Sequence, residues 1–130
     1  MYASSLKRCL ETAALLYPDV QVEMLADLRE YDFGGWENKD YADLNGRADY
    51  QAWIDSGGES RAQFAARCVA AFEGTREQTE DCALIAHGGT LMAIMERYAL
   101  PRGTYFDFQV KNGCGVILNG DGSYEAIEKT

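Results

Sequence analysis

The feature of this sequence that most constrains its fold is the junction at residues 82–90. A continuous apolar run, Cys82 to Ala86, leads directly into His87-Gly88-Gly89-Thr90 and then into a segment with helical spacing. A short apolar run of this kind suits a strand buried on both faces of a parallel sheet. The two glycines then turn the chain into a helix over about 90–99, which Pro101 closes. The junction therefore predicts a helix that begins at the carboxyl end of a buried strand.

The N-terminal residues repeat this order of strand and helix. Residues 2–4 are typical of the end of a strand, and the apolar spacing that follows predicts a helix over 6–17. We expect Ser4 or Ser5 to cap the start of this helix, and Pro18 to stop it.

The rest of the chain predicts one more strand, three helices and a hairpin. Apolar and polar residues alternate over 20–24, which predicts a short strand, and helices are expected at about 40–46, 48–54 and 59–72. A glycine-rich turn between residues 116–118 and 124–127 predicts a C-terminal hairpin. Together these elements predict an α/β fold, a three-layer sandwich with a mostly parallel sheet and a C-terminal hairpin, in one domain over 1–130.

The charge of the chain excludes several classes of partner. The formal net charge is −9, and most of the acidic excess lies in residues 19–59. Duplex nucleic acids and anionic membranes would be repelled by such a field, so no nucleic-acid or membrane partner is expected. An acidic stretch is most often a solvated face. No apolar run approaches the roughly 18 residues that span a bilayer.

The cysteines predict a reducing compartment. None of the four sits in a C-x-x-C pair, and most lie on apolar faces or strands: Cys9, Cys68, Cys82 and Cys114. We interpret them as reduced core residues of a cytoplasmic protein. The N-terminus lacks a charged segment followed by an apolar stretch, so a signal peptide is not expected either. No spacing of ligands indicates a metal site, and no cofactor is expected.

Three predicted strand ends carry side chains that suit phosphate chemistry. Arg8, Glu30 and His87 each follow a predicted strand. Ligands of open α/β sheets bind outside the carboxyl ends of the strands. The free N–H groups at Gly88 and Gly89 favour an anion, an arginine can grip phosphate in a bidentate fashion, and a carboxyl group can exchange a proton with a leaving oxygen. Taken singly, the three residues read as a structural histidine, a surface cation and a solvated carboxylate.

Three segments of the chain resemble the histidine phosphatase superfamily, whose members have a phosphoglycerate-mutase-like fold. They are Ser4–Ala13, Leu28–Glu37 and Ile85–Thr90, with support from Gly57-Gly58-Glu59-Ser60. The Asp-Phe-Gly-x-Trp-Glu wording of the second segment looks most like the alpha-ribazole phosphatase branch, which removes phosphate from a cobalamin precursor. The resemblance implies that Arg8, His87 and Gly88 bind the phosphoryl group and that Glu30 is the proton donor.

One departure from the family pattern changes what the resemblance implies. The family's nucleophile is a histidine in an Arg-His-Gly motif at the end of the first strand, whereas the single histidine of this chain, His87, matches the second pocket position. The sequence resembles the family from within its second strand onward. The resemblance thus implies a missing central strand, little or no phosphatase activity in the chain as given, and a rearranged sheet or a homodimer that covers the gap. Two alternatives remain: a non-catalytic domain that binds a phosphorylated ligand or a protein, and a mutase of the same fold.

Overall fold

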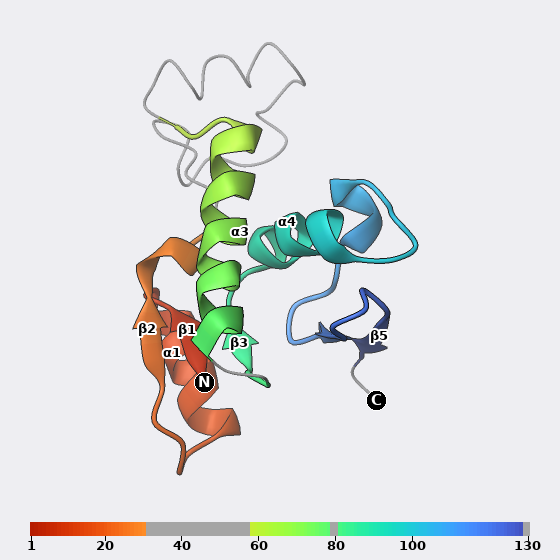
Figure 1. Cartoon of the computed structure of the whole chain (residues 1–130). Helices are drawn as coiled ribbons and strands as arrows, with labels where there is room; N and C mark the ends of the chain where they lie inside the picture. Colours follow the sequence, from red (N-terminus) through yellow and green to blue (C-terminus); the bar gives the residue numbers. More distant parts are fainter. Residues whose placement is uncertain (31–57, 79–80, 129–130) are drawn as a thin grey trace.

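A computed structural model describes residues 1–30, 58–78 and 81–128 of the chain (Figure 1). The two short helices expected at 40–46 and 48–54, and most of the Leu28–Glu37 segment, lie outside the described residues. The described elements alternate between strands and helices and end in a hairpin, so the predicted α/β class is confirmed.

A parallel three-stranded sheet organises the N-terminal half of the fold. Strand β1 (Tyr2–Ser4) lies between β2 (Glu23–Leu25) and β3 (Leu84–Ile85), and both pairings are parallel. Every residue of β1 is buried, as expected for a central strand, whereas β2 is largely exposed. The strand predicted over 82–86 is shorter than expected, and the one predicted over 20–24 begins later, because each pairs only where it faces β1.

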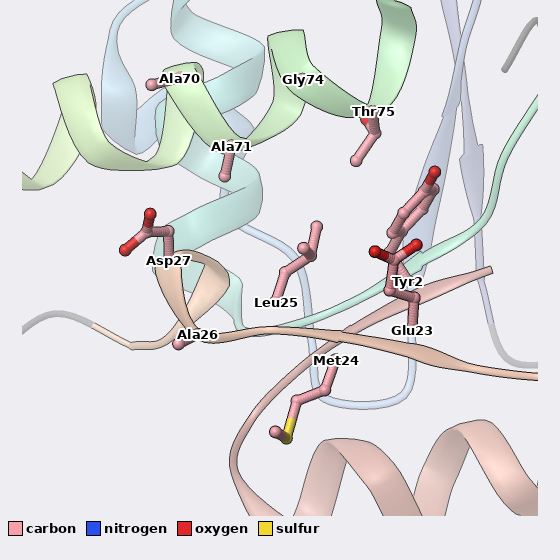
Figure 2. A pocket seen from close by; sticks show the side chains of 10 residues that line it. All are labelled: Tyr2, Glu23, Met24, Leu25, Ala26, Asp27, Ala70, Ala71, Gly74 and Thr75. Atoms are coloured by element: carbon pink, nitrogen blue, oxygen red, sulfur yellow. The ribbon is translucent and has the colours of Figure 1, made fainter. Parts of the chain in front are cut away.

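Helices lie on opposite sides of these strands. Helix α1 (Lys7–Leu16) packs below β1 and β2 in the view of Figure 2, and α3 (Arg61–Gln78) packs above them. The predicted serine cap of α1 is wrong: Leu6 is the N-cap residue, and no side chain caps the helix. Ser4 belongs to β1 instead, and its hydroxyl group contacts His87.

The main hydrophobic core lies between α3, α4 (Gly88–Tyr98) and the 3-10 helix η4 (Tyr105–Phe108). The helix predicted over 59–72 is confirmed as α3, which extends further, to Gln78, and its Phe64 and Cys68 are fully buried in this core. Its other buried members come from α4 and η4 and the segment between them: Met92, Ala93, Ile94, Met95, Ala99, Tyr105 and Phe108. This core fixes α4, and with it the N-terminus of α4, against α3.

The predicted C-terminal hairpin is confirmed as β4 (Gly115–Leu118) and β5 (Tyr124–Ile127), an antiparallel pair that forms a sheet of its own. Its turn docks on the end of α4. The backbone N–H of Leu100 donates to the carbonyl of Gly122 at 2.8 Å, and Gly122 has a φ of 92°. A Cβ atom at this position would lie 2.8 Å from the carbonyl oxygen of Tyr98, so both the conformation and the space favour glycine.

All four cysteines are free, as predicted. Their placement is only partly as expected, because Cys9 and Cys68 are buried, Cys114 is half-buried and Cys82 is exposed. Across residues 1–30, 58–78 and 81–128, no helix has the length and apolar character that crossing a membrane requires. The same ranges contain no group of three or more His, Cys, Asp or Glu residues placed to hold a metal ion.

Candidate phosphate site at the strand ends

The parallel sheet brings Arg8 and His87 into contact. Arg8 lies in the first turn of α1, after β1, and His87 is the N-cap residue of α4, after β3. Because β1 and β3 run parallel, their carboxyl ends meet at one edge, and Nη2 of Arg8 lies 3.2 Å from Nδ1 of His87. His87 is buried and Arg8 is exposed, so the pair joins the interior to the surface.

The contacts of His87 identify its tautomer. A guanidinium group can only donate hydrogen bonds, so Nδ1 accepts from Arg8 and carries no proton. The proton of the neutral ring therefore sits on Nε2, which donates to Oγ of Ser4 at 2.9 Å. Burial lowers the pKa of His87, the positive charges of Arg8 and Arg67 lower it further, and the carboxylate of Glu30 opposes them. Together these effects favour the neutral imidazole.

Cys9 completes the surroundings of the ring. Its thiol donates to the carbonyl of Ala86 at 3.3 Å, and Sγ lies 3.6 Å from Nε2 of His87. Burial raises the pKa of the Cys9 thiol, so the group stays protonated and is no nucleophile. The sequence predicted Cys9 only as a core residue, because its nearness to His87 depends on the pairing of β1 with β3.

Glu30 reaches the same site from the other side. The segment after the 3-10 helix η1 (Ala26–Leu28) carries its carboxylate to the first turn of α4. There, Oε1 lies 2.8 Å from the position that a Cβ atom on Gly89 would occupy, and the hydroxyl group of Tyr105 lies 3.0 Å from that position. Gly89 therefore leaves room for the ends of these two side chains, which would have to shift to admit a Cβ atom. All three residues predicted from the strand ends gather around the N-terminus of α4.

Arg67 and Thr90 hold the segment that carries Glu30, and no sequence pattern marked either of them as functional. The guanidinium of Arg67 pairs with both carboxylate oxygens of Glu59 and donates to backbone carbonyls of residues 27, 29 and 30. Thr90, which is fully buried, donates to the carbonyl of Leu28 at 3.0 Å. One arginine within a helical pattern looks like a surface cation, and only the long-range contacts reveal its role.

A cavity of about 310 Å³ lies elsewhere, between α3 and strands β1 and β2 (Figure 2). Small helix residues and two carboxylates contribute to its lining, which consists of Tyr2, Glu23, Met24, Leu25, Ala26, Asp27, Ala70, Ala71, Gly74 and Thr75. None of the three residues predicted from the strand ends lines this cavity. We therefore place the candidate site at the N-terminus of α4 and not in this hollow.

Two relatives of known activity match much of the chain. The adenosylcobalamin/alpha-ribazole phosphatase of Salmonella typhimurium (strain LT2) is 29% identical over 131 residues, and its namesake in Escherichia coli (strain K12) is 28% identical over 130 residues. Each match covers 89% of this chain but only 64% of the relative. The chain thus spans less than two thirds of the length of these two enzymes.

Solved structures and a family model agree with these matches. The protein TTHB049 from Thermus thermophilus superimposes with a TM-score of 0.74 at 25% identity, over 99% of this chain and 72% of that one. A phosphoglycerate mutase from the same organism gives a TM-score of 0.73 at 25% identity, with the same coverage. The model of the histidine phosphatase superfamily (branch 1) matches residues 1–130. The chain therefore belongs to the histidine phosphatase superfamily, branch 1.

Proposed function

We propose that this chain binds the phosphoryl group of a small phosphorylated metabolite, similar to alpha-ribazole phosphate, at the N-terminus of α4. The observation that supports this most directly is the contact between Arg8 and His87 at 3.2 Å, because it places a guanidinium and an imidazole together where a helix begins. The names of the two curated relatives support the substrate class. The same names indicate that the reaction of these relatives is hydrolysis of a phosphomonoester.

The proposed binding step changes the hydrogen bonds of the site. Arg8 leaves Nδ1 of His87 and donates two hydrogen bonds to the phosphate dianion, while the N–H of Gly88 and the helix dipole add to the attraction. The freed Nδ1 then takes up a proton, since the neighbouring dianion favours the imidazolium. Glu30, on the opposite side of the helix N-terminus, is the proposed proton donor to the leaving oxygen.

The number of histidines limits catalysis by the chain as given. The phosphohistidine route of the family needs a nucleophilic histidine in addition to the one that His87 matches, and the 130 residues contain only His87. Loss of a nucleophile lowers the rate by many powers of ten, although electrostatic stabilisation alone retains weak catalysis. We therefore propose that these 130 residues, as one domain, bind phosphate esters and hydrolyse them very slowly or not at all.

Two measurements on the 130-residue chain test this proposal. Hydrolysis of an aryl phosphate is expected to be near background in both the unmodified chain and His87→Ala. Titration with orthophosphate, followed by the NMR signals of the only imidazole, is expected to saturate, and Arg8→Gln is expected to abolish the change. Rapid phosphate release that survives His87→Ala would contradict the assigned site, as would the absence of any response to orthophosphate.

The second candidate function is a binding domain that has no catalytic role in any context. The presence of a single histidine favours this function too. A measurement of phosphate-ester hydrolysis distinguishes the phosphatase from the binding domain. If joining the chain to an Arg-His-Gly segment restores hydrolysis, the phosphatase is supported, whereas phosphate binding without restored turnover supports the binding domain. A mutase needs the same second histidine, and the match to the phosphoglycerate mutase, at 25% identity, is lower than the 29% and 28% to the two phosphatases.

The strand edges suggest a partner for the sheet. Among the described strands, β2 and β3 each pair on one side only, with β1. Unpaired strand edges favour association with another strand. We propose that a second copy of the chain covers one of these edges, and sedimentation at several concentrations tests this, since a monomer throughout would contradict it.

A further inference from the structure

We propose that Arg67 and Glu59 form a positioning pair that holds Glu30 at the first turn of α4, beside His87. Neither residue touches the proposed phosphate position, so both act through the backbone that carries Glu30. This inference rests on the proposed role of Glu30 as proton donor, and it adds the residues that fix where this donor stands.

The guanidinium of Arg67 makes five hydrogen bonds, which match its five N–H groups. Two run to Glu59, from Nε to Oε2 at 2.9 Å and from Nη2 to Oε1 at 2.6 Å. Three run to backbone carbonyls: Nη1 donates to Asp27 at 2.8 Å and to Arg29 at 2.9 Å, and Nη2 donates to Glu30 at 3.2 Å. Only a planar fork can satisfy all of these groups, so a lysine at 67 would release part of the segment.

The pair is largely, although not fully, shielded from water. The side chains of Arg67 and Glu59 are only 11% and 14% exposed. At such depth, a polar group without its partner is costly, so the contacts persist rather than exchange with water. Thr90 fastens the same segment from α4 through the carbonyl of Leu28. The backbone before Glu30 is thus held from two helices.

The presence of Glu59 explains how an arginine can stand so close to a proton donor. An uncompensated guanidinium would favour the ionised form of a nearby carboxyl group and would also oppose protonation of His87. The carboxylate of Glu59 neutralises Arg67 at 2.6 Å. Arg67 thus holds the carbonyls of the segment beside a counter-ion, although its charge still contributes to lowering the pKa of His87.

The remaining link is the space at Gly89. On this held backbone, Oε1 of Glu30 lies 2.8 Å from the position that a Cβ atom on Gly89 would occupy. This position brings the carboxylate within electrostatic reach of His87, whose pKa it raises. The coupling between Glu30 and His87 is therefore a direct readout of the position of Glu30.

A double-mutant cycle on the 130-residue chain tests the proposal through the pKa of His87, which NMR reads without ambiguity because the chain has one histidine. Glu30→Gln is expected to lower the pKa of His87, since a favourable negative charge is lost. In the Arg67→Lys background, which keeps the charge of residue 67, the same change is expected to have little effect. Glu59→Gln provides a second background, with the same expectation, if Arg67→Lys does not fold.

Matched controls keep the outcome clear. Arg76→Lys lies on the same helix with its side chain 46% exposed, and it is expected to leave the effect of Glu30→Gln unchanged. Gly89→Ala pushes the carboxylate away directly and is expected to weaken the coupling without any change at Arg67. An equal effect of Glu30→Gln in the unmodified and Arg67→Lys chains overturns the proposal, and so does no effect in the unmodified chain. Failure to bind orthophosphate, with the cycle as expected, would instead count against the proposed function alone.

Discussion

The two sides of the candidate site are held in different ways. On one side, Arg8 is exposed in the first turn of α1, and its contact with the site is a single hydrogen bond to the neutral ring of His87. On the other side, Glu30 follows a backbone segment that Arg67 and Thr90 fix from two helices. The exposed cation can therefore change partners at little cost, whereas the backbone that carries the proposed acid is held in place.

This division suits a site that receives an anion. Moving an exposed arginine from an imidazole to a phosphate exchanges one hydrogen bond for stronger, charge-assisted ones. A fixed acid needs no rearrangement when the ester arrives, which is the advantage of preorganised groups. Substitutions on each side of the site test this division through the free energy of unfolding that each one loses.

The largest expected effect comes from the fixed side. Arg67→Ala removes the ion pair with Glu59 and the hydrogen bonds to three backbone carbonyls, and breaking a largely buried pair in this way costs about 3–5 kcal/mol. Urea unfolding measures the loss. Arg76→Ala, on the same helix but exposed, is expected to change the free energy of unfolding by about 0.5 kcal/mol at most. Equal losses in the two variants would mean that the Arg67 clamp does not hold the fold.

Thr90→Val is expected to have the next largest effect. It keeps the shape of the side chain but removes the hydroxyl donor, which leaves the carbonyl of Leu28 without this buried partner. An unsatisfied buried group of this kind costs about 1–3 kcal/mol. Thr90→Ser keeps the donor and serves as the control in the same urea titration. A loss in the serine variant as large as in the valine variant would assign the effect to packing.

His87 connects the two sides, and it should make stability depend on pH. Because burial lowers its pKa in the folded chain, the unfolded chain takes up a proton near pH 6.5 while the folded chain does so only at lower pH. The free energy of unfolding is therefore expected to fall as pH drops below about 6.5 and to be insensitive to His87 above it. His87→Gln should remove this part of the pH dependence, measured by urea unfolding at several pH values. An unchanged pH profile in the variant would show that the ring titrates normally.

The smallest change in stability is expected on the movable side. Arg8→Gln removes one hydrogen bond from an exposed side chain, so the free energy of unfolding should change by about 0.5 kcal/mol at most. Urea unfolding again provides the measurement, beside the loss of the phosphate response described above. If this variant unfolds as readily as Arg67→Ala, the division into a movable and a fixed side is wrong.

Local sequence patterns predicted the elements well and their contacts less well. The helix over 6–17 and the hairpin rest on spacing and turn residues, which act over a few residues and are visible in the sequence. The serine cap failed because the hydroxyl of Ser4 contacts His87 across the sheet, and no local pattern encodes that partner. The strands differ from their predicted bounds because their length depends on how far β1 extends beside them, which no local pattern encodes either.

The gathering of Arg8, Glu30 and His87 could be anticipated from topology alone, because carboxyl ends of parallel strands share one edge. What the sequence could not show is which groups hold these three. Arg67 reaches residues about forty positions away, and its partners are backbone carbonyls that every residue type possesses. Such contacts leave no signature in the side chains that they join.

The hairpin turn contacts the end of α4, so this helix connects the hairpin to the sheet. Its first turn meets the sheet at His87, and just beyond its last turn Leu100 is hydrogen-bonded to Gly122. The helix has 11 residues and is roughly 16 Å long, and it is in contact with other elements at both ends. The hairpin and the proposed phosphate position therefore lie at opposite ends of one short helix.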